Sequence, residues 1–128
     1  MSEQFISWIP PLGWMLVIHM VSGVSGPELP DGPFPHFDKV IHFGVYALLS
    51  LLFFRAFCSM EKWRPWTCVL FCVLFTSGYG GWDEMRQASV IGRASDEWDL
   101  LLDVAGACVV AILPVLMKYK PEWYQWLK

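Results

Sequence analysis

The sequence predicts an all-α fold, a polytopic membrane protein whose single domain, residues 1–128, is a bundle of four transmembrane helices. The first observation behind this prediction is the composition, which is 55% hydrophobic and only 16% charged, whereas a soluble domain carries about 25% charged residues. The second is the grouping of apolar residues into four runs, each close to the ~20 residues that span a bilayer core. Because no water reaches that core, such runs have to be helical.

The first predicted helix covers residues 5–22 and the second covers residues 39–58. Pro10 and Pro11 favour a regular helix that begins close to them, because proline fits the first helical turn. Prolines and glycines crowd the segment between residues 23 and 37, which predicts an irregular loop between these two helices.

The third predicted helix covers residues 65–82 and the fourth covers residues 98–117. A cluster of glycines that starts after Ser77 places the end of the third helix near Trp82. The C-terminal residues, 118–128, combine tryptophans with lysines, and this combination predicts a segment at the membrane–water interface.

The basic residues predict the orientation of the bundle. With four spans, both termini and the middle turn share one side, which holds Arg55, Lys62, Arg64, Lys118, Lys120 and Lys128. The opposite side holds only Lys39, Arg86 and Arg93, together with most of the acidic residues. The positive-inside rule therefore predicts that both termini are cytoplasmic and that the acidic side faces outward.

Composition also narrows the function and the chemistry of the cysteines. The chain has a net charge of −3 and no basic surface, which excludes a nucleic-acid-binding protein. The four cysteines lack the spacing and the neighbouring histidines of a zinc site. We therefore expect them to be buried small hydrophobic residues without disulfides: Cys58, Cys68, Cys72 and Cys108.

Polar residues begin the second predicted helix at a spacing of four. Asp38, His42 and Tyr46 share one helix face, so Asp38 is placed to orient a ring nitrogen of His42. Such a carboxylate–imidazole pair suits general base catalysis or metal ligation. The alternative is that Asp38 caps the helix while Lys39 extends its ammonium group to the lipid head groups.

Two further groups of polar residues flank the connection between the third and fourth predicted helices. Glu84 and Gln87 share a face at the end of the third helix, and Asp99 and Asp103 form a stripe on the fourth. Gly106 continues that stripe and predicts the close approach of another helix. Arg93 lies in the turn between them, as a partner for Glu84 or Asp99 or as a binding group for phosphate or carboxylate.

These blocks resemble the VanZ-like family of small bacterial membrane proteins, whose pattern is roughly D-K-x-x-H-F-x-x-Y, then E-x-x-Q, then R-x-x-S/T-x-x-D-x-x-x-N-x-x-G. The matching positions are Asp38, Lys39, His42, Phe43, Tyr46, Glu84, Gln87, Arg93, Asp99 and Gly106. Asp103 stands where the family has asparagine. The resemblance implies a multi-pass protein of the bacterial inner (cytoplasmic) membrane, and the family takes its name from a protein associated with resistance to the glycopeptide teicoplanin.

Three functions remain open at this point. The first is a protein, surrounded by the lipid bilayer, that binds an envelope precursor or partner in a polar pocket on the outer face. The second is an enzyme that hydrolyses a lipid-linked phosphate. The third is proton or ion transport, for which so short a chain would have to oligomerise to enclose a path.

The enzymatic hypothesis assigns roles to individual residues. Catalysis would fall to Asp38, His42 and Glu84, with Glu84 as general acid. Lys39, Tyr46, Gln87 and Arg93 would bind the phosphorylated precursor. A divalent cation such as Mg²⁺ or Ca²⁺, held by oxygen ligands that include Asp99 and Asp103, would offset the excess of carboxylates. We expect Glu84, Arg93 and His42 to line one pocket.

Overall fold

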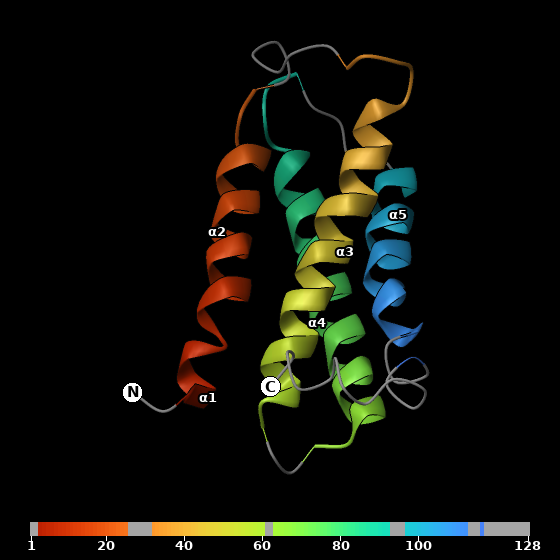
Figure 1. The fold of residues 1–128 in the computed structure, drawn as a ribbon. Coiled ribbons are helices and arrows are strands. Elements are labelled where there is room, and N and C mark those ends of the chain that lie inside the picture. Colours follow the sequence, from red (N-terminus) through yellow and green to blue (C-terminus); the bar gives the residue numbers. More distant parts are fainter. Residues whose placement is uncertain (1–2, 26–31, 61–62, 93–96, 113–115, 117–128) are drawn as a thin grey trace.

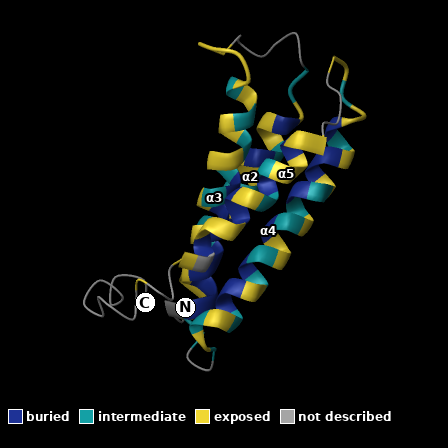
Figure 2. Cartoon of the chain, turned by 90° about the vertical axis from the view of Figure 1, so that its right-hand side faces the viewer, coloured by how far each residue is buried: buried dark blue, intermediate teal, exposed yellow. Residues whose placement is uncertain are grey.

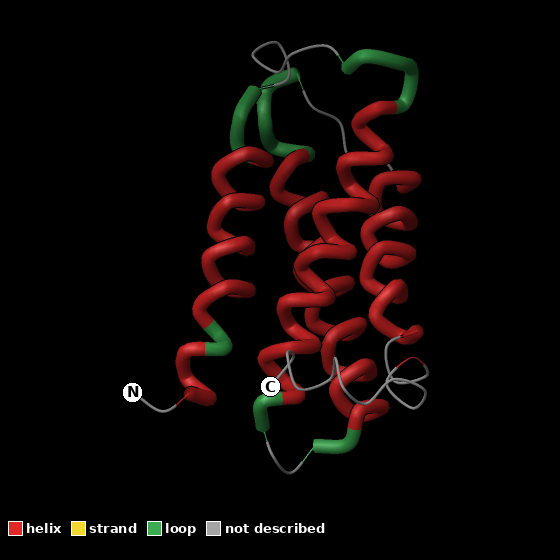
Figure 3. The backbone as a smooth tube through the Cα atoms, viewed as in Figure 1, coloured by secondary structure: helices red, strands yellow, loops and turns green. Residues whose placement is uncertain are grey.

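The computed structural model describes residues 3–25, 32–60, 63–92, 97–112 and 116, and all regular elements within these ranges are helical (Figure 3). In chain order they are α1 (Glu3–Ile6), α2 (Ile9–Ser22), α3 (Phe37–Cys58), α4 (Pro65–Gln87), α5 (Glu97–Cys108) and the 3₁₀ helix η2 (Val109–Ile112). The helices run side by side, with α3 against both α4 and α5 and with α2 along one side (Figure 1). The prediction of an all-α fold is confirmed.

Prolines set two of the helix starts. Pro10 and Pro11 occupy the first turn of α2, and Pro65 opens α4 after the extended residue Arg64. Both starts follow from the fixed φ of proline, which suits the first helical turn. Helix α3 begins after His36, whose φ of 62° lies in the left-handed region.

The end of α4 differs from the prediction, because the helix continues past residue 82 to Gln87. The glycines do not end the helix, and Gly80 serves close packing. A Cβ atom on Gly80 would lie 3.0 Å from Oδ2 of Asp103 and 3.3 Å from a ring carbon of Tyr46. The additional turn carries Asp83, Glu84 and Gln87 into the bundle, where all three are buried.

Of the fourth predicted helix, 98–117, the structure describes residues 98–112 and 116, and all of them are helical. Helix α5 ends at Cys108 and gives way to η2, which has the tighter winding often found at helix ends. The predicted interfacial segment, 118–128, lies outside the described residues. Cys108 is exposed, so the prediction that all four cysteines are buried is wrong at this position.

Helices α3 and α5 approach each other almost to backbone contact. A Cβ atom on Gly106 would lie 2.5 Å from the carbonyl oxygen of Phe43 and 2.9 Å from the amide nitrogen of Ala47. One turn further along α3, Ser50 Oγ donates a hydrogen bond to the carbonyl of Ala107 at 2.8 Å. The close approach predicted for Gly106 is confirmed, and it brings the α5 carboxylates within reach of α3.

Two hydrogen bonds from α4 attach helix α2 to the bundle through its main-chain carbonyls. Tyr79 Oη donates to the carbonyl of Met15 at 2.7 Å, and Arg86 donates to the carbonyl of His19 at 2.6 Å. In the opposite direction, Trp14 Nε1 donates to the carbonyl of Val45 on α3 at 3.1 Å.

The outer surface of the bundle is apolar. By length and composition, the segments Gln4–Ser22 and Phe37–Cys58 are each able to cross a membrane. Figure 2 shows the buried residues facing inward and the exposed residues on the outside. The exposed residues include large apolar side chains on α2 and α4, namely Leu12, Leu16, Met20, Leu70, Leu74 and Phe75. So extended an apolar exterior is unusual for a soluble monomer and fits lipid contact.

Candidate functional site

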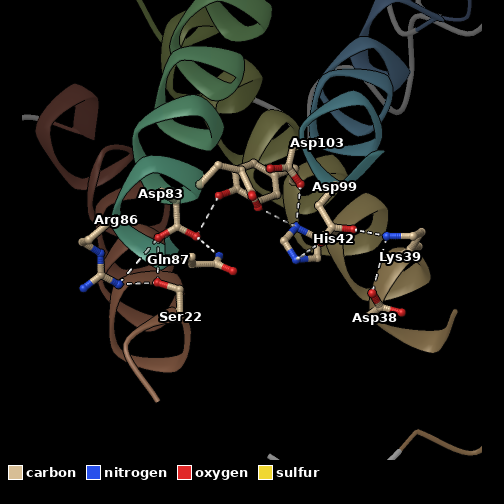
Figure 4. Close-up of polar contacts among 11 residues, drawn as sticks. Ser22, Asp38, Lys39, His42, Asp83, Arg86, Gln87, Asp99 and Asp103 are labelled. Carbon is tan, nitrogen blue, oxygen red and sulfur yellow. Dashed lines mark hydrogen bonds and ion pairs between the residues drawn. The ribbon is translucent and has the colours of Figure 1, made fainter. Parts of the chain in front are cut away.

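Polar side chains from four helices meet at one end of the bundle. This polar cluster lies where α2 and α4 end and where α3 and α5 begin (Figure 4), at the end of the bundle opposite the end of α3 and the start of α4 (Figure 1). Its members are Ser22, Lys39, His42, Tyr46, Asp83, Glu84, Arg86, Gln87, Asp99 and Asp103. The predicted blocks on the second, third and fourth helices therefore do come together.

His42 lies among carboxylates from two other helices. Its Nδ1 is 2.9 Å from Oδ1 of Asp103 and 3.9 Å from Oε1 of Glu84, and its Nε2 is 3.8 Å from Oδ2 of Asp99. The imidazole ring also stacks on Tyr46, the next residue on the same face of α3. The side chain is only 11% exposed, so packing and hydrogen bonding fix its orientation.

Asp38 does not orient His42, contrary to the prediction. Its side chain is 62% exposed and forms an ion pair with Lys39 at 3.6 Å, while Asp103 supplies the carboxylate that contacts the imidazole. The capping alternative is also wrong, because α3 begins at Phe37 and Asp38 lies within its first turn. The α3–α5 contact at Gly106 explains why Asp103, and not Asp38, contacts the imidazole, since this contact brings Asp103 close to His42.

Asp99, predicted as a metal ligand, is bound by a lysine instead. Lys39 Nζ donates to Asp99 Oδ1 at 2.8 Å, and both side chains are mostly buried. Lys39, predicted to hold an anionic substrate, therefore links the start of α3 to the start of α5.

This ion pair leads to a testable expectation. Lys39→Met should destabilise the protein by about 1–2 kcal/mol, because Asp99 loses a charged hydrogen bond in a poorly hydrated position. A double-mutant cycle with Asp99→Asn, followed by thermal unfolding in detergent, measures the coupling between the two side chains. Strictly additive effects would show that the pair contributes nothing to stability.

The other half of the cluster is organised around Asp83. This residue is 1% exposed and accepts hydrogen bonds from Ser22 Oγ at 2.6 Å, Gln87 Nε2 at 2.8 Å and Tyr46 Oη at 3.3 Å. Tyr46 and Gln87, predicted as substrate ligands, are thus bound to an internal carboxylate. Together with the hydrogen bond from Ser22, these contacts to Asp83 join α2, α3 and α4.

Arg86 completes this half of the cluster. It lies 3.6 Å from Asp83, donates to the hydroxyl of Ser22 and stands over the ring of Trp82. The sequence prediction missed Asp83 and Arg86 because it took Glu84 and Gln87 as the polar face at the end of the third helix. A helical stripe through Thr76 and Asp83, seven residues apart, was the signal that could have identified the buried carboxylate.

A cavity of about 180 Å³ lies between α2 and α3 beside the cluster. Most of its wall is apolar and comes from Trp14, Val17, Ile18, Val21, Ile41 and Val45. Its polar part is formed by Ser22, His42, Tyr46, Asp83 and Gln87. Of the predicted pocket of Glu84, Arg93 and His42, the first and last lie together as expected, and Arg93 is outside the described residues.

Comparison with known proteins identifies the family. The VanZ/LLP1 family model matches residues 3–118. An uncharacterized protein of the fission yeast Schizosaccharomyces pombe is 30% identical over 105 residues, which cover 82% of this chain and 62% of that protein. This chain thus spans less than two thirds of the length of that relative. No solved structure matches this chain. The two apolar segments agree with a membrane protein, and the chain belongs to the VanZ/LLP1 family.

Proposed function

We propose that this protein binds a lipid-linked envelope precursor, with the hydrocarbon chain in the cavity between α2 and α3 and the head group at the polar cluster. The observation that carries the proposal is the cavity itself, since an apolar wall leads directly to buried hydrogen-bonding groups. Ligand sites commonly combine a mostly apolar lining with a few placed polar groups. Here the polar groups lie at one end, as an amphiphilic ligand requires.

The proposed topology has four membrane spans. Helix α4 is 23 residues long and exposes Trp66, Leu70 and Leu74, so it is long enough for a bilayer of ~30 Å. The distribution of basic residues supports cytoplasmic termini. In that orientation the polar cluster lies at the outer face of the membrane. For a bacterial protein, the membrane in question is the inner (cytoplasmic) membrane.

The apolar part of the cavity has the right size for a section of a lipid chain. An apolar cavity of about 150 Å³ is large enough to bind benzene, so one of about 180 Å³ accommodates a slightly larger hydrocarbon group. Val17 and Val21 line the cavity and are 44% and 55% exposed. The cavity is therefore reached from the apolar outer surface, where lipid chains lie.

The polar part favours a head group that is rich in hydroxyls or associated with a cation. Asp83 borders the cavity, and its carboxylate repels an isolated phosphate. His42 and Gln87 border it as well and are able to form hydrogen bonds with sugar or phosphate oxygens. Any effect on glycopeptide resistance would follow from precursor binding.

Photo-crosslinking tests this proposal directly. A polyprenyl phosphate that carries a sugar head group and a diazirine in its chain is expected to label the lining of α2 and α3 in the purified protein. Val45→Phe should weaken binding at least about tenfold because the larger side chain fills the cavity. Val40→Phe, at an exposed position of the same helix, is the matched control. Equal labelling of both variants, or labelling spread over the outer surface, would contradict the proposal.

Hydrolysis of the bound lipid phosphate is a second candidate, and the contact between His42 and Asp103 favours it. A carboxylate 2.9 Å from a ring nitrogen holds an imidazole in one orientation, as general base catalysis requires. Release of phosphate from a polyprenyl phosphate, lost in His42→Gln, would support this candidate. Binding of the lipid without release of phosphate would contradict hydrolysis and support binding alone.

Ion transport receives less support. The polar cluster occupies one end of the bundle, and toward the other end α3 buries Phe53, Phe54 and Phe57. This part of the described core is apolar, which does not suit a chain of proton carriers.

A further inference from the structure

We propose that His42, Glu84 and Asp103 form a binding site for a divalent transition-metal ion, with Zn²⁺ as the preferred ion. The three residues come from α3, α4 and α5, and one ligand atom from each lies within 4.8 Å of the other two. This inference goes beyond lipid binding and does not depend on it, although the two sites share His42.

The distances suit one ion after small side-chain rotations. Zinc lies about 2.0–2.2 Å from histidine nitrogen and carboxylate oxygen, so two ligand atoms of a tetrahedral site are roughly 3.4 Å apart. Two separations in the structure bracket this value, at 2.9 Å from His42 Nδ1 to Asp103 and at 3.9 Å from the same atom to Glu84. Three protein ligands also leave a fourth position open, as in catalytic zinc sites.

An independent observation at Asp103 points to a cation. Asp103 is fully buried, and its Oδ2 has no hydrogen-bond partner among the described residues. This oxygen faces α4 at Gly80, where a Cβ atom would lie 3.0 Å away, one helical turn before Glu84. An unsatisfied oxygen on a buried carboxylate is costly, and a bound cation would remove that cost. The packing at Gly80 therefore keeps space for the unsatisfied oxygen.

The donor atoms select the kind of metal. A site with an imidazole nitrogen suits zinc and related transition metals, whereas Mg²⁺ and Ca²⁺ prefer oxygen ligands alone. The sequence-based suggestion of Mg²⁺ or Ca²⁺ at Asp99 and Asp103 is thereby revised in both the ion and the ligands. Asp99 is bound by Lys39, and its Oδ2 lies 3.8 Å from Nε2 of His42, the ring nitrogen that does not contact Asp103.

The test measures metal content and ligand type in the purified full chain. Protein stripped with EDTA is loaded with Zn²⁺, and bound zinc is counted by mass spectrometry. Co²⁺ is then substituted as a spectroscopic probe. We expect one ion per chain, a higher melting temperature, and cobalt d–d bands without the near-ultraviolet charge-transfer band of thiolate ligands. That band would instead place the metal at the buried thiols of Cys58, Cys68 and Cys72 and overturn the proposal.

Conservative variants identify the ligands. Glu84→Gln and Asp103→Asn should reduce bound zinc to background, whereas Asp38→Asn, at an exposed carboxylate, should keep one ion per chain. Melting in EDTA shows whether each variant is folded, and His42→Gln replaces any variant that is not. Zinc retained by the folded ligand variants, or no zinc in the native protein, would overturn the proposal. Val45→Phe separates the two proposals, because it should lose lipid and keep zinc.

Discussion

Asp83→Ala is expected to destabilise the protein by about 3–5 kcal/mol, the usual cost of removing one member of a buried charged pair. The substitution leaves the donors of Ser22, Tyr46 and Gln87 without their shared acceptor in a buried position. It also removes the carboxylate that faces Arg86. Because these donors belong to three helices, the loss should loosen the contact of α2 with α3 and α4.

Thermal unfolding in detergent measures this effect, with Asp38→Ala as the matched control. The Asp38 side chain is 62% exposed, and such surface substitutions usually change stability by less than about 0.5 kcal/mol. Equal melting temperatures for the two variants would mean that the hydrogen bonds to Asp83 contribute no net stability. In that case the burial of these polar side chains would serve ligand binding and not the stability of the fold.

Gly106→Ala is expected to destabilise the protein by about 1–3 kcal/mol, the typical cost of overpacking. The new Cβ would lie 2.5 Å from a carbonyl oxygen of α3, and a backbone atom cannot rotate out of the way. Helices α3 and α5 would have to separate, which moves Asp103 away from His42. We therefore expect weaker zinc binding together with the lower melting temperature.

Gly44→Ala and Gly78→Ala are the controls for this substitution. Both glycines lie within helices, and a Cβ on either one meets no atom within 4 Å. Each substitution should therefore raise stability by up to about 1 kcal/mol, the helix-propensity advantage of alanine over glycine. If Gly106→Ala were also stabilising, the close packing of α3 and α5 would not be required for the fold.

Local sequence patterns predicted the helices and most of the residues in the cluster. Apolar runs and prolines gave the starts of α2 and α4, and the spacing of Asp103 and Gly106 predicted the helix contact. Patterns within one helix do not reveal a partner on another helix, however. For this reason the sequence assigned His42 to Asp38, four residues away, and the structure pairs it with Asp103.

The buried carboxylate at Asp83 escaped prediction for a related reason. Glycines weaken a helix in isolation, and sequence alone does not show that Gly80 is needed for contact with Asp103 and Tyr46. The spacing of Glu84 and Gln87 identified one face of the last turn, and the neighbouring Asp83 and Arg86 were left without a role. Tertiary packing overrode local preference here, and the packing is what creates the site.

The attachment of α2 through its carbonyls has a consequence for how this family diverges. The hydrogen bonds from Tyr79 and Arg86 end on the main chain at Met15 and His19, and every amino acid supplies the same carbonyl. Selection should therefore preserve the two donors while Met15 varies among apolar residues, and His19 is constrained further because its ring stacks on Trp82. A saturation library should show broader tolerance at Met15 than at Tyr79 and Arg86.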